Sequence, residues 1–313
     1  MTDISTTGAT AEPVPYLKAD GTGNDFIVLL DPDDTLDLTP ASIVAWCDRR
    51  TGIGADGVLR IVRRGDGSFF MDYRNADGTL AETCGNGLRV VAHVLHRAGL
   101  VDAGAHTIGT RGGDVRVQVP GTGDITVSMG TAVTLPESLV VQQAGGVELP
   151  AVAVLMPNPH AVAFVEDLQT LGPLSASPTH APAATLPDGA NYEFVEVRAA
   201  DHIRMRVFER GVGETLSCGS GACAAAVVAA DRAGAVAPWR MRVDVPGGTL
   251  WVDGGVSGEV SLTGPAQVTA EGVLPSGAAT PGEPTAAVDA ANSSSSPAAD
   301  RNPPQPDPAG KSR

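Results

Sequence analysis

The chain carries the same short motif twice, and this repeat is the strongest constraint on its fold. Glu-Thr leads into Cys-Gly-x-Gly at 82–87 and again, in the form ETLSCGSG, at 214–221. The two cysteines, Cys84 and Cys218, are 134 residues apart, and an Ala/Val-rich run typical of a helix follows each of them. Two copies of this unit predict two similar halves, each with one principal helix that begins at a Cys-Gly turn.

Short apolar runs, separated by turn residues, make up most of the chain outside these helices. Runs such as FIVLL (26–30), YEFVEV (192–197) and EVSLTG (259–264) have the length and the β-branched content of strands. The expected helices are few and lie at about 40–49, 86–98 and 221–233. The sequence therefore predicts an α+β fold in which strands dominate.

Composition marks several segments that contribute little to a core. Residues 1–14 and the tail at 275–313, which is rich in Pro, Ala and Ser, are expected to be disordered because they lack apolar periodicity. The turn-rich stretches 132–150 and 169–190 are expected to be loops or poorly ordered insertions.

The rest of the chain divides into an N-terminal half, 15–131, and a C-terminal half, 132–264. A strand near 265–274 is expected to return to the N-terminal half. With 313 residues, of which 42% are hydrophobic, the chain is long enough to form two such units.

The composition also narrows the range of partners. A net charge of −15 argues against nucleic acid, which proteins bind through clustered Lys and Arg. No run of about 18 apolar residues occurs, so no membrane partner is expected, and the first residues lack the basic-then-apolar order of a signal peptide. We therefore expect a cytoplasmic protein. The sequence does not fix its oligomeric state, for which a homodimer is one expectation.

Each repeated cysteine lies where a helix is expected to begin, and that position favours reactivity. Unpaired N–H groups and a partial positive charge at a helix N-terminus stabilise a thiolate, so we expect a lowered pKa for Cys84 and Cys218. The flanking glycines let the backbone approach a carboxylate closely. Two such units facing each other could remove a proton from one face of a carbon and return one to the opposite face, which inverts a stereocentre without a cofactor.

Other interpretations of the cysteines are a disulfide, a zinc site and buried core thiols. A disulfide is unfavourable in a reducing compartment, and the spacing lacks the close Cys pairs of a zinc site, so no metal is expected. Core thiols are the interpretation for Cys47 and Cys223. The chain has only two lysines, Lys18 and Lys311, so a pyridoxal enzyme would have at most one suitable Schiff-base residue.

Blocks of the chain, in order, resemble the diaminopimelate epimerase family. They are GTGNDFIVLLD (21–31), RRTGIGADGV (49–58), DYRNADGTLAETCGNGLRVVAH (72–93), PNPHAV (157–162), GANYEFVEV (189–197), FERGVGETLSCGSGACAAA (208–226) and VPGGTL (245–250). Together they extend from about 16 to 273.

The resemblance implies a pyridoxal-independent enzyme that epimerises LL-2,6-diaminopimelate to meso-diaminopimelate, in lysine and peptidoglycan precursor biosynthesis. It implies two pseudo-symmetric halves, each a curled, mostly antiparallel sheet around a central helix, with the active site in the cleft between them. The partner is then a small diamino diacid substrate. Cys84 and Cys218 are the acid–base pair, and no cofactor takes part.

The same resemblance assigns the residues that contact the substrate. The reacting α-carboxylate is held at the two helix N-termini, by Gly85, Asn86, Gly219 and Ser220. Four asparagines match ligand contacts of the family: Asn24, Asn75, Asn158 and Asn191. Glu209 and Arg210 match the pair that reads amino and carboxylate groups, while His160 and Glu209 lie near the thiols in the family and tune them.

Two positions depart from the family pattern. Asp20 stands where members often have His, and Gly57 stands where many have Gln. The first substitution alters the local charge near the cleft, and the second removes a polar contact to the ligand. Neither affects the pair of thiols.

The nearest alternative functions belong to other enzymes of this architecture: a proline or hydroxyproline racemase, or an isomerase of the phenazine-biosynthesis type. The far end of the ligand distinguishes them, because a diamino diacid needs a second carboxylate reader, which Arg210 and the asparagines supply. An alternative of another class is a non-catalytic binding or redox-sensing protein, which would bind the diacid without exchanging its α-hydrogen.

The composition of the tail leads to a first testable prediction. A chain truncated near residue 275 should keep its epimerase activity and its thermal midpoint, because the Pro/Ala/Ser-rich tail offers too little apolar surface to pack. Thermal denaturation and turnover of the truncated and full-length chains would be compared. A large fall in the midpoint would show that part of the tail packs against the folded protein.

Overall fold

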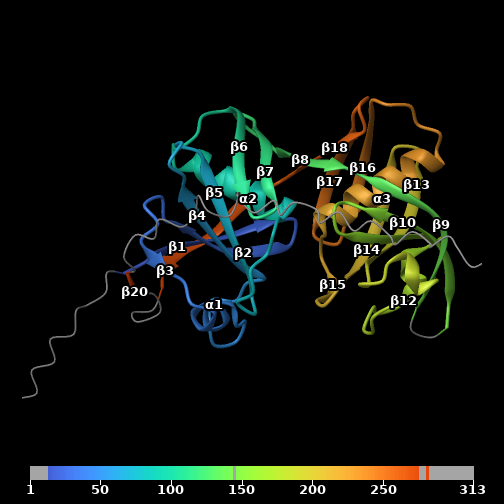
Figure 1. Ribbon diagram of the computed structural model, residues 1–313, viewed down its shortest axis with the longest axis horizontal. Coiled ribbons are helices and arrows are strands. Elements are labelled where there is room, and N and C mark those ends of the chain that lie inside the picture. The colour runs from blue at the N-terminus through green and yellow to red at the C-terminus, as the bar shows by residue number, and fades with distance from the viewer. Residues whose placement is uncertain (1–12, 144–145, 275–279, 282–313) are drawn as a thin grey trace, which may run out of the picture.

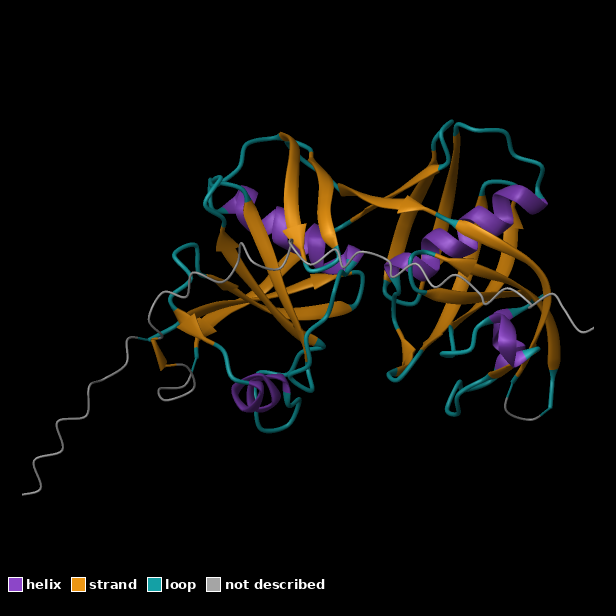
Figure 2. Cartoon of the chain, viewed as in Figure 1, coloured by secondary structure: helices purple, strands orange, loops and turns teal. Residues whose placement is uncertain are grey.

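The computed structural model describes residues 13–143, 146–274 and 280–281, which form two bodies side by side (Figure 1). Helix α2 (Gly85–Arg97) runs through the first body and α3 (Gly219–Arg232) through the second, and strands surround both helices (Figure 2). The predicted fold class is confirmed. The expected disordered ends, 1–14 and 275–313, lie outside the described residues except at 13–14 and 280–281.

The first half is built from seven strands in chain order. They are β1 (Pro15–Gly21), β2 (Asn24–Leu30), β4 (Gly57–Arg63), β5 (Phe69–Asn75), β6 (Gly104–Thr110), β7 (Gly113–Val119) and β8 (Ile125–Thr131). Neighbours pair antiparallel, except for the parallel pairs β2–β4 and β5–β6. Between β2 and β4 lie β3 (Leu36–Asp37), which pairs with β20 (Thr280–Pro281), and helix α1 (Pro40–Cys47).

The second half repeats this arrangement. Its strands are β10 (Glu148–Leu155), β11 (Pro159–Phe164), β13 (Asn191–Ala199), β14 (His202–Glu209), β16 (Trp239–Val245), β17 (Gly248–Gly254) and β18 (Glu259–Gly264). The parallel pairs, β11–β13 and β14–β16, occupy the same places in the order. The short strand β15 (Gly213–Thr215) pairs antiparallel with the end of β14, on the side opposite β13, just before Cys218.

A shift of 134 residues relates the two halves well beyond the cysteine motif. It carries β2 onto β11, β4 onto β13 and α2 onto α3, within two residues at each end. The strand register obeys the same shift, because Phe26 pairs with Gly57 in β2–β4 and His160 pairs with Asn191 in β11–β13. Both helices also end at a left-handed glycine, Gly99 or Gly234, whose conformation a residue with a Cβ rarely adopts.

The chain crosses between the halves twice, and this ties them together. β8 pairs antiparallel with β18, so strands of both halves join in one sheet (Figure 1). After β8 the chain continues into β9 (Val133–Gln142), which pairs with β10 of the second half. After β18 it continues into β19 (Gln267–Val273), which pairs with β1 of the first half. The halves therefore cannot separate without loss of backbone hydrogen bonds.

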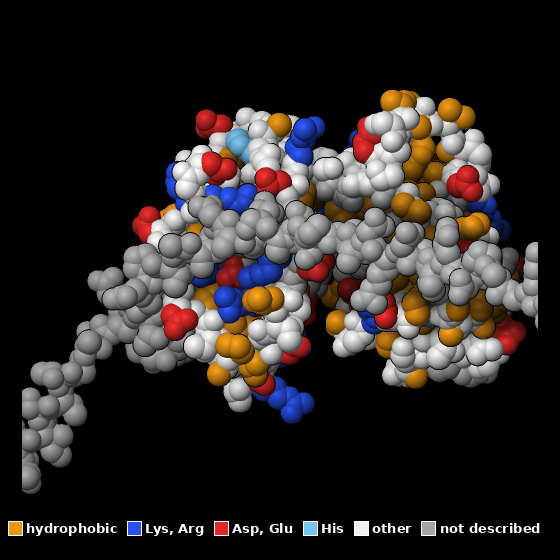
Figure 3. All heavy atoms as spheres, viewed as in Figure 1, with side chains coloured by type: hydrophobic (Ala, Val, Ile, Leu, Met, Phe, Trp, Pro, Cys, Tyr) orange, Lys and Arg blue, Asp and Glu red, His pale blue; other side chains and the backbone are white. Residues whose placement is uncertain are grey.

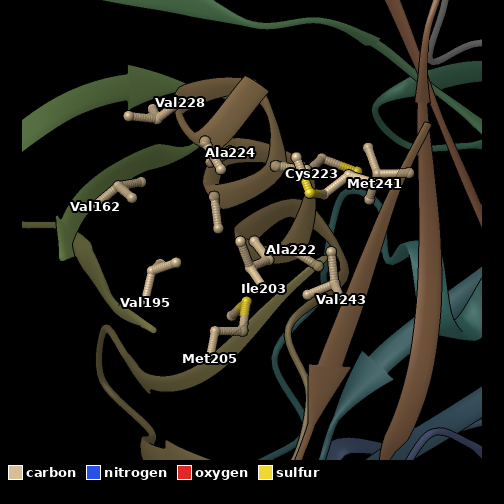
Figure 4. Close-up of a cluster of buried hydrophobic side chains, with 14 of the residues drawn as sticks. Val162, Val195, Ile203, Met205, Ala222, Cys223, Ala224, Val228, Met241 and Val243 are labelled. Atoms are coloured by element: carbon tan, nitrogen blue, oxygen red, sulfur yellow. The ribbon is translucent and has the colours of Figure 1, made fainter. Parts of the chain in front are cut away.

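Each central helix is the middle of a hydrophobic core. Around α3, the small side chains Ala222, Cys223 and Ala224 let the surrounding strands approach the helix, and Ile203 and Met241 pack against it (Figure 4). The two cysteines predicted to be core thiols are buried, Cys223 in this core and Cys47 in a separate cluster beside α1. In the described part of the chain, no helix combines the length and the apolar character that a membrane span requires.

The prediction of loops is wrong for most of 132–150, whereas most of 169–190 has the loop structure that was expected. The first stretch forms β9 and the start of β10, whose register shifts between Val152 and Val154. Pro136 falls in this irregularity, where a residue without an N–H is tolerated, and its presence hid the strand in the sequence. The second stretch holds two 3₁₀ turns, Leu168–Leu171 and Ala183–Thr185, and the strand β12 (Thr179–Ala181), which pairs with β9.

Candidate active site

The repeated cysteines are the N-cap residues of the two central helices. Cys84 and Cys218 both have extended backbone, with φ of −144° and −120°, and the helices begin at the next residue. The Cys84 Sγ accepts a hydrogen bond from the backbone N–H of Gly87 at 3.3 Å, the position at which Ser or Asp usually caps a helix. The Cys218 Sγ lies 3.6 Å from the Ser220 hydroxyl. Each sulfur is therefore held at the positive end of a helix.

The N-termini of α2 and α3 meet at the junction of the halves. A Cβ added to Gly219 would lie 3.3 Å from the Asn86 Oδ1, and one added to Gly85 would lie 3.0 Å from the sulfur of Met129. The Asn86 side chain also donates from Nδ2 to the backbone carbonyl of Ser217 at 3.3 Å. A side chain at Gly219 would force Leu262 or Asn86 to shift, so glycine favours this approach, which directs the unpaired N–H groups of two helices toward one region and favours an anion there.

Beneath this junction, a buried arginine of the first half holds Asn86 and Thr22, the two side chains that hydrogen-bond Ser217 of the second half. Arg89, which has no exposed surface, donates to the Asn86 Oδ1 at 3.0 Å, to the Thr22 Oγ1 at 2.9 Å and to the Pro265 carbonyl at 3.3 Å. These partners are all neutral. Burial lowers the pKa of Arg89 to about 10, so it keeps its charge at neutral pH. Its positive charge adds to that of the helix N-termini.

Thr22 completes the connection to the loop before Cys218. Its hydroxyl lies 3.1 Å from that of Ser217, and its φ of 62° is unusual for a β-branched residue. A Cβ on Gly247 would fall 1.8 Å from the Thr22 carbonyl oxygen, so Gly247 is required for this contact. The strained turn between β1 and β2 is thus held against the second half by hydrogen bonds and close packing.

Titratable side chains surround Cys218. Glu209, at the end of β14, accepts a hydrogen bond from the Thr215 hydroxyl. Burial raises the pKa of Glu209, against the opposing effect of hydrogen bonds from Thr215 and Cys218. His160 and Glu193 are both fully buried, with the His160 Nδ1 2.7 Å from the Glu193 Oε1.

The surroundings of Cys84 are less charged. Its Sγ lies 3.7 Å from the Asn24 Oδ1, and the Asn24 amide in turn donates to the Asp56 carboxylate at 2.8 Å. Phe26 and Tyr73 pack edge to face, with ring centroids 5.8 Å apart, in the same apolar cluster as Cys84.

The prediction of a lowered thiol pKa is wrong for the ligand-free protein. Burial raises the pKa of Cys84 to about 11 and raises that of Cys218 well above its ordinary value. The Glu209 charge raises both, while the N–H of Gly87 opposes the effect at Cys84. Removal of water from around the sulfurs outweighs the helix N-termini, so both groups are thiols at neutral pH.

The other predicted residues lie at the ends of strands near the junction. Asn158 places its Oδ1 3.0 Å from the His160 Nε2, and the Asn191 Oδ1 accepts a hydrogen bond from the backbone N–H of Arg210 at 2.9 Å. The exposed Arg210 guanidinium donates to the Asp188 carbonyl at 2.8 Å. Asn75, the last residue of β5, hydrogen-bonds Thr79, four residues further along the chain, rather than another predicted site residue. Figure 3 shows the surface hollowed between the lower parts of the two halves.

Comparison with known proteins identifies the family. The sequence profile described as diaminopimelate epimerase matches residues 16–135 and 152–269. The chain belongs to the diaminopimelate epimerase family. It is 50% identical over 274 residues to the diaminopimelate epimerase of Streptomyces coelicolor, which covers 83% of this chain and 94% of the relative. The enzyme of the same name from Acidothermus cellulolyticus is 42% identical, with 84% and 96% covered.

Solved structures of other enzyme families share the fold. A phenazine biosynthesis protein of the PhzF family from Bacillus anthracis superposes with a TM-score of 0.61 at 18% identity, covering 84% of this chain and 99% of that one. A probable proline racemase from Agrobacterium radiobacter superposes with a TM-score of 0.60 at 14% identity, covering 84% and 93%. At this identity the likeness concerns the fold alone.

The structure shows the surroundings of Gly57 and Asp20, the two positions expected to depart from the family pattern. A Cβ on Gly57 would fall 2.5 Å from the Arg74 carbonyl oxygen and 2.7 Å from a ring carbon of Tyr73, so strand β5 leaves no room for a side chain at position 57. Burial raises the pKa of Asp20, which hydrogen bonds from Gly23 and Gln267 oppose. Lys18, the one lysine among the described residues, binds Asp25 at 2.6 Å and the Gly54 carbonyl.

Four residues of the junction were not predicted from the sequence: Thr22, Tyr73, Arg89 and Glu193. The 134-residue shift contained a signal for two of them. It carries Leu59 onto Glu193 and Arg89 onto Cys223, so each is a polar residue whose counterpart in the other half is apolar or weakly polar. Such an asymmetry within a repeat indicates a position with a function of its own. Thr22 and Tyr73 left no comparable signal.

Replacement of Arg89 by Lys tests the connection between the halves. Lysine keeps the charge but cannot reach Asn86, Thr22 and the Pro265 carbonyl together, because it lacks the planar fork of five donors. We expect a loss of about 3 kcal/mol in the free energy of unfolding, on the scale of lost hydrogen bonds to a buried charge. Urea denaturation of Arg89→Lys and wild type measures it.

Arg97→Lys is the matched control for this substitution. Arg97 lies at the other end of the same helix, is 47% exposed and pairs with Glu271. The substitution Arg97→Lys should change the free energy of unfolding by less than about 0.5 kcal/mol. Equal effects of the two substitutions would contradict the role given to Arg89.

Proposed function

We propose that the site at the junction of α2 and α3 epimerises LL-2,6-diaminopimelate to meso-diaminopimelate, without a cofactor, by acid–base catalysis between Cys84 and Cys218. This step belongs to lysine and peptidoglycan precursor biosynthesis. The observation that carries the proposal is the meeting of two cysteine-capped helix N-termini, in a chain of the diaminopimelate epimerase family. Each half supplies one of the two thiols. The first half is 15–131 together with the returning strand at 265–274, and the second half is 132–264.

The substrate's α-carboxylate binds to the backbone N–H groups at the two helix N-termini. Gly85 and Asn86 supply those of α2, and Gly219 and Ser220 supply those of α3. As one thiolate removes the α-proton, negative charge develops on the α-carbon and its carboxylate, where the oriented N–H groups and the Arg89 charge stabilise it. The thiol of the other half donates a proton to the opposite face, and the configuration inverts.

Burial makes the two thiolates stronger bases. In water, the pKa of a thiol lies far below that of a carbon-bound α-proton, and desolvation of the thiolate narrows this difference. The raised pKa of both cysteines therefore brings them closer to the basicity that carbon deprotonation requires. The α-ammonium of the substrate supplies a positive charge beside the thiolate, and we place it against Glu209, whose carboxyl group lies next to Cys218.

Recognition of the far end of the substrate falls to Arg210 and the four asparagines, Asn24, Asn75, Asn158 and Asn191. Arg210 is exposed, and its backbone is fixed by Asn191. A guanidinium that donates to the Asp188 carbonyl through one nitrogen can bind a carboxylate through its remaining donors. This contact with the second carboxylate of the substrate distinguishes a diamino diacid from proline, which has one carboxylate. We also propose a cytoplasmic location, because the mechanism requires reduced thiols.

Replacement of each thiol by alanine tests this function. Cys84→Ala and Cys218→Ala should each reduce epimerisation by at least about 10³-fold, because neither face of the α-carbon has a substitute acid or base. The measurement is the formation of meso-diaminopimelate from the LL isomer by reduced protein, with circular dichroism to verify folding. Cys47→Ala, in the separate cluster beside α1, is the control and should retain activity. Full turnover by either single variant would overturn the site assignment.

A further inference from the structure

The two thiols have different environments, and the repeat shows where the difference lies. Under the 134-residue shift, Cys84 corresponds to Cys218 and Gly87 corresponds to Gly221. A Cβ on Gly87 would contact the side chain of Leu59 at 3.3 Å and the Cβ of Cys84 at 3.4 Å. A leucine therefore lies beside the turn that carries the first thiol.

In the second half, a carboxyl group takes the place of this leucine. A Cβ on Gly221 would fall 2.6 Å from the Glu193 Oε1 and 3.3 Å from the Cβ of Cys218. The Glu193 carboxyl group and the Cys218 side chain thus flank one backbone position, where only glycine leaves room for both. Glu193 has no exposed surface, so water does not screen its effect on the thiol.

His160 fixes the orientation of this carboxyl group. The His160 Nδ1 lies 2.7 Å from the Glu193 Oε1, and the Asn158 Oδ1 lies 3.0 Å from the His160 Nε2. The Glu193 Oε2 is buried and has no hydrogen-bond partner within the described residues. The counterpart of His160 in the first half is Phe26, so the whole polar pair is confined to the side of Cys218.

We propose that Glu193 is a positioning residue that keeps Cys218 protonated in the ligand-free protein, so that Cys84 is the thiol that loses its proton first. Near Cys218, the groups that titrate are Glu209 of β14, Glu193 of β13 and His160 of β11. The charges of Glu209 and Glu193 both raise the pKa of Cys218, beyond the effect of burial.

At Cys84 the balance of charges is different. Hydrogen bonds lower the pKa of both thiols, from the N–H of Gly87 at Cys84 and from Ser220 and the N–H of Gly221 at Cys218, and Glu209 raises both. The difference is that the positive charge of Arg89 lowers the pKa of Cys84, and that no counterpart of Glu193 is present there because Leu59 fills that place. Both groups are thiols in the ligand-free protein at neutral pH, and Cys84 is the one that gives up its proton more readily to become the base, with Cys218 as the acid. The substrate isomer whose α-hydrogen faces Cys84 reacts directly with the form in which Cys84 has lost its proton.

The pH dependence of alkylation tests the proposal on each thiol separately. Ligand-free, reduced protein is treated with iodoacetamide over a pH series, and peptide mass spectrometry gives the extent of modification at Cys84 and at Cys218. The midpoints are compared rather than the rates, because Cys218 is only 6% exposed and its access is restricted. In wild type, we expect Cys84 to titrate at lower pH than Cys218. The reverse order, or equal midpoints, would overturn the proposal without any variant.

Glu193→Gln removes the charge and keeps a group of similar size beside His160. We expect the alkylation midpoint of Cys218 to fall by about one pH unit and the midpoint of Cys84 to stay unchanged. At a fixed pH below the midpoint, this shift makes alkylation of Cys218 about tenfold faster. Glu193→Asp keeps the charge and should leave Cys218 close to wild type. An unchanged midpoint in Glu193→Gln would contradict the role of the carboxylate.

Leu59→Met, at the corresponding position of the first half, is the control for disturbance of packing and should shift neither midpoint. If it moved Cys218 as far as Glu193→Gln does, the proposal would fail. The consequence for turnover rests on the proposed function, but alkylation of ligand-free protein involves no substrate. Equal titration of the two thiols would therefore refute this inference alone, whereas full turnover by Cys84→Ala would refute the site assignment.

Discussion

The contact between the N-termini of α2 and α3 is the constraint on which the rest of the structure depends. Asn86 of α2 lies against Gly219 of α3, where a Cβ would come within 3.3 Å of the Asn86 Oδ1, and the Arg89 guanidinium holds Asn86 and Thr22 in place beneath the junction. Such an approach places partial positive charges side by side, which is unfavourable without an anion. We therefore propose that a bound carboxylate completes the site. We regard this as the physical reason why the two halves of the repeat form one site.

Two opposing effects set the behaviour of the thiols. Desolvation favours the neutral form of both sulfurs, while N–H groups and Arg89 favour the charged form, and in the ligand-free protein desolvation prevails. The substrate changes this balance because it brings an ammonium group and displaces water. The repeat makes the frame symmetric, but the reaction needs one base and one acid, and side chains such as Glu193 and His160 on one side break the symmetry.

The repeated motif in the sequence allowed the prediction of two halves and their two central helices, because turn chemistry and apolar periodicity are local properties, whereas the family was inferred from the resemblance of seven ordered blocks. The strand β9 escaped prediction because Pro136 lies in a register shift that only the pairing with β10 reveals. The raised thiol pKa also escaped prediction, since a helix N-terminus is visible in the sequence but the burial of a sulfur is not. The contacts of Thr22 and Arg89 join residues far apart in the chain, and no local pattern indicates them.

The central claim is that two different groups act on opposite faces of one carbon. Its most direct test is the deuterium content of substrate and product during early turnover of LL-diaminopimelate in D₂O. With two bases, the meso product carries one solvent deuterium at the inverted α-carbon, because the thiol that donates to the opposite face has exchanged with D₂O. The remaining LL substrate carries almost none, because the thiol that removed the proton can return only that proton to the original face. Deuterium appearing at comparable rates in recovered substrate and in product would show that a single base serves both faces, and would contradict the account.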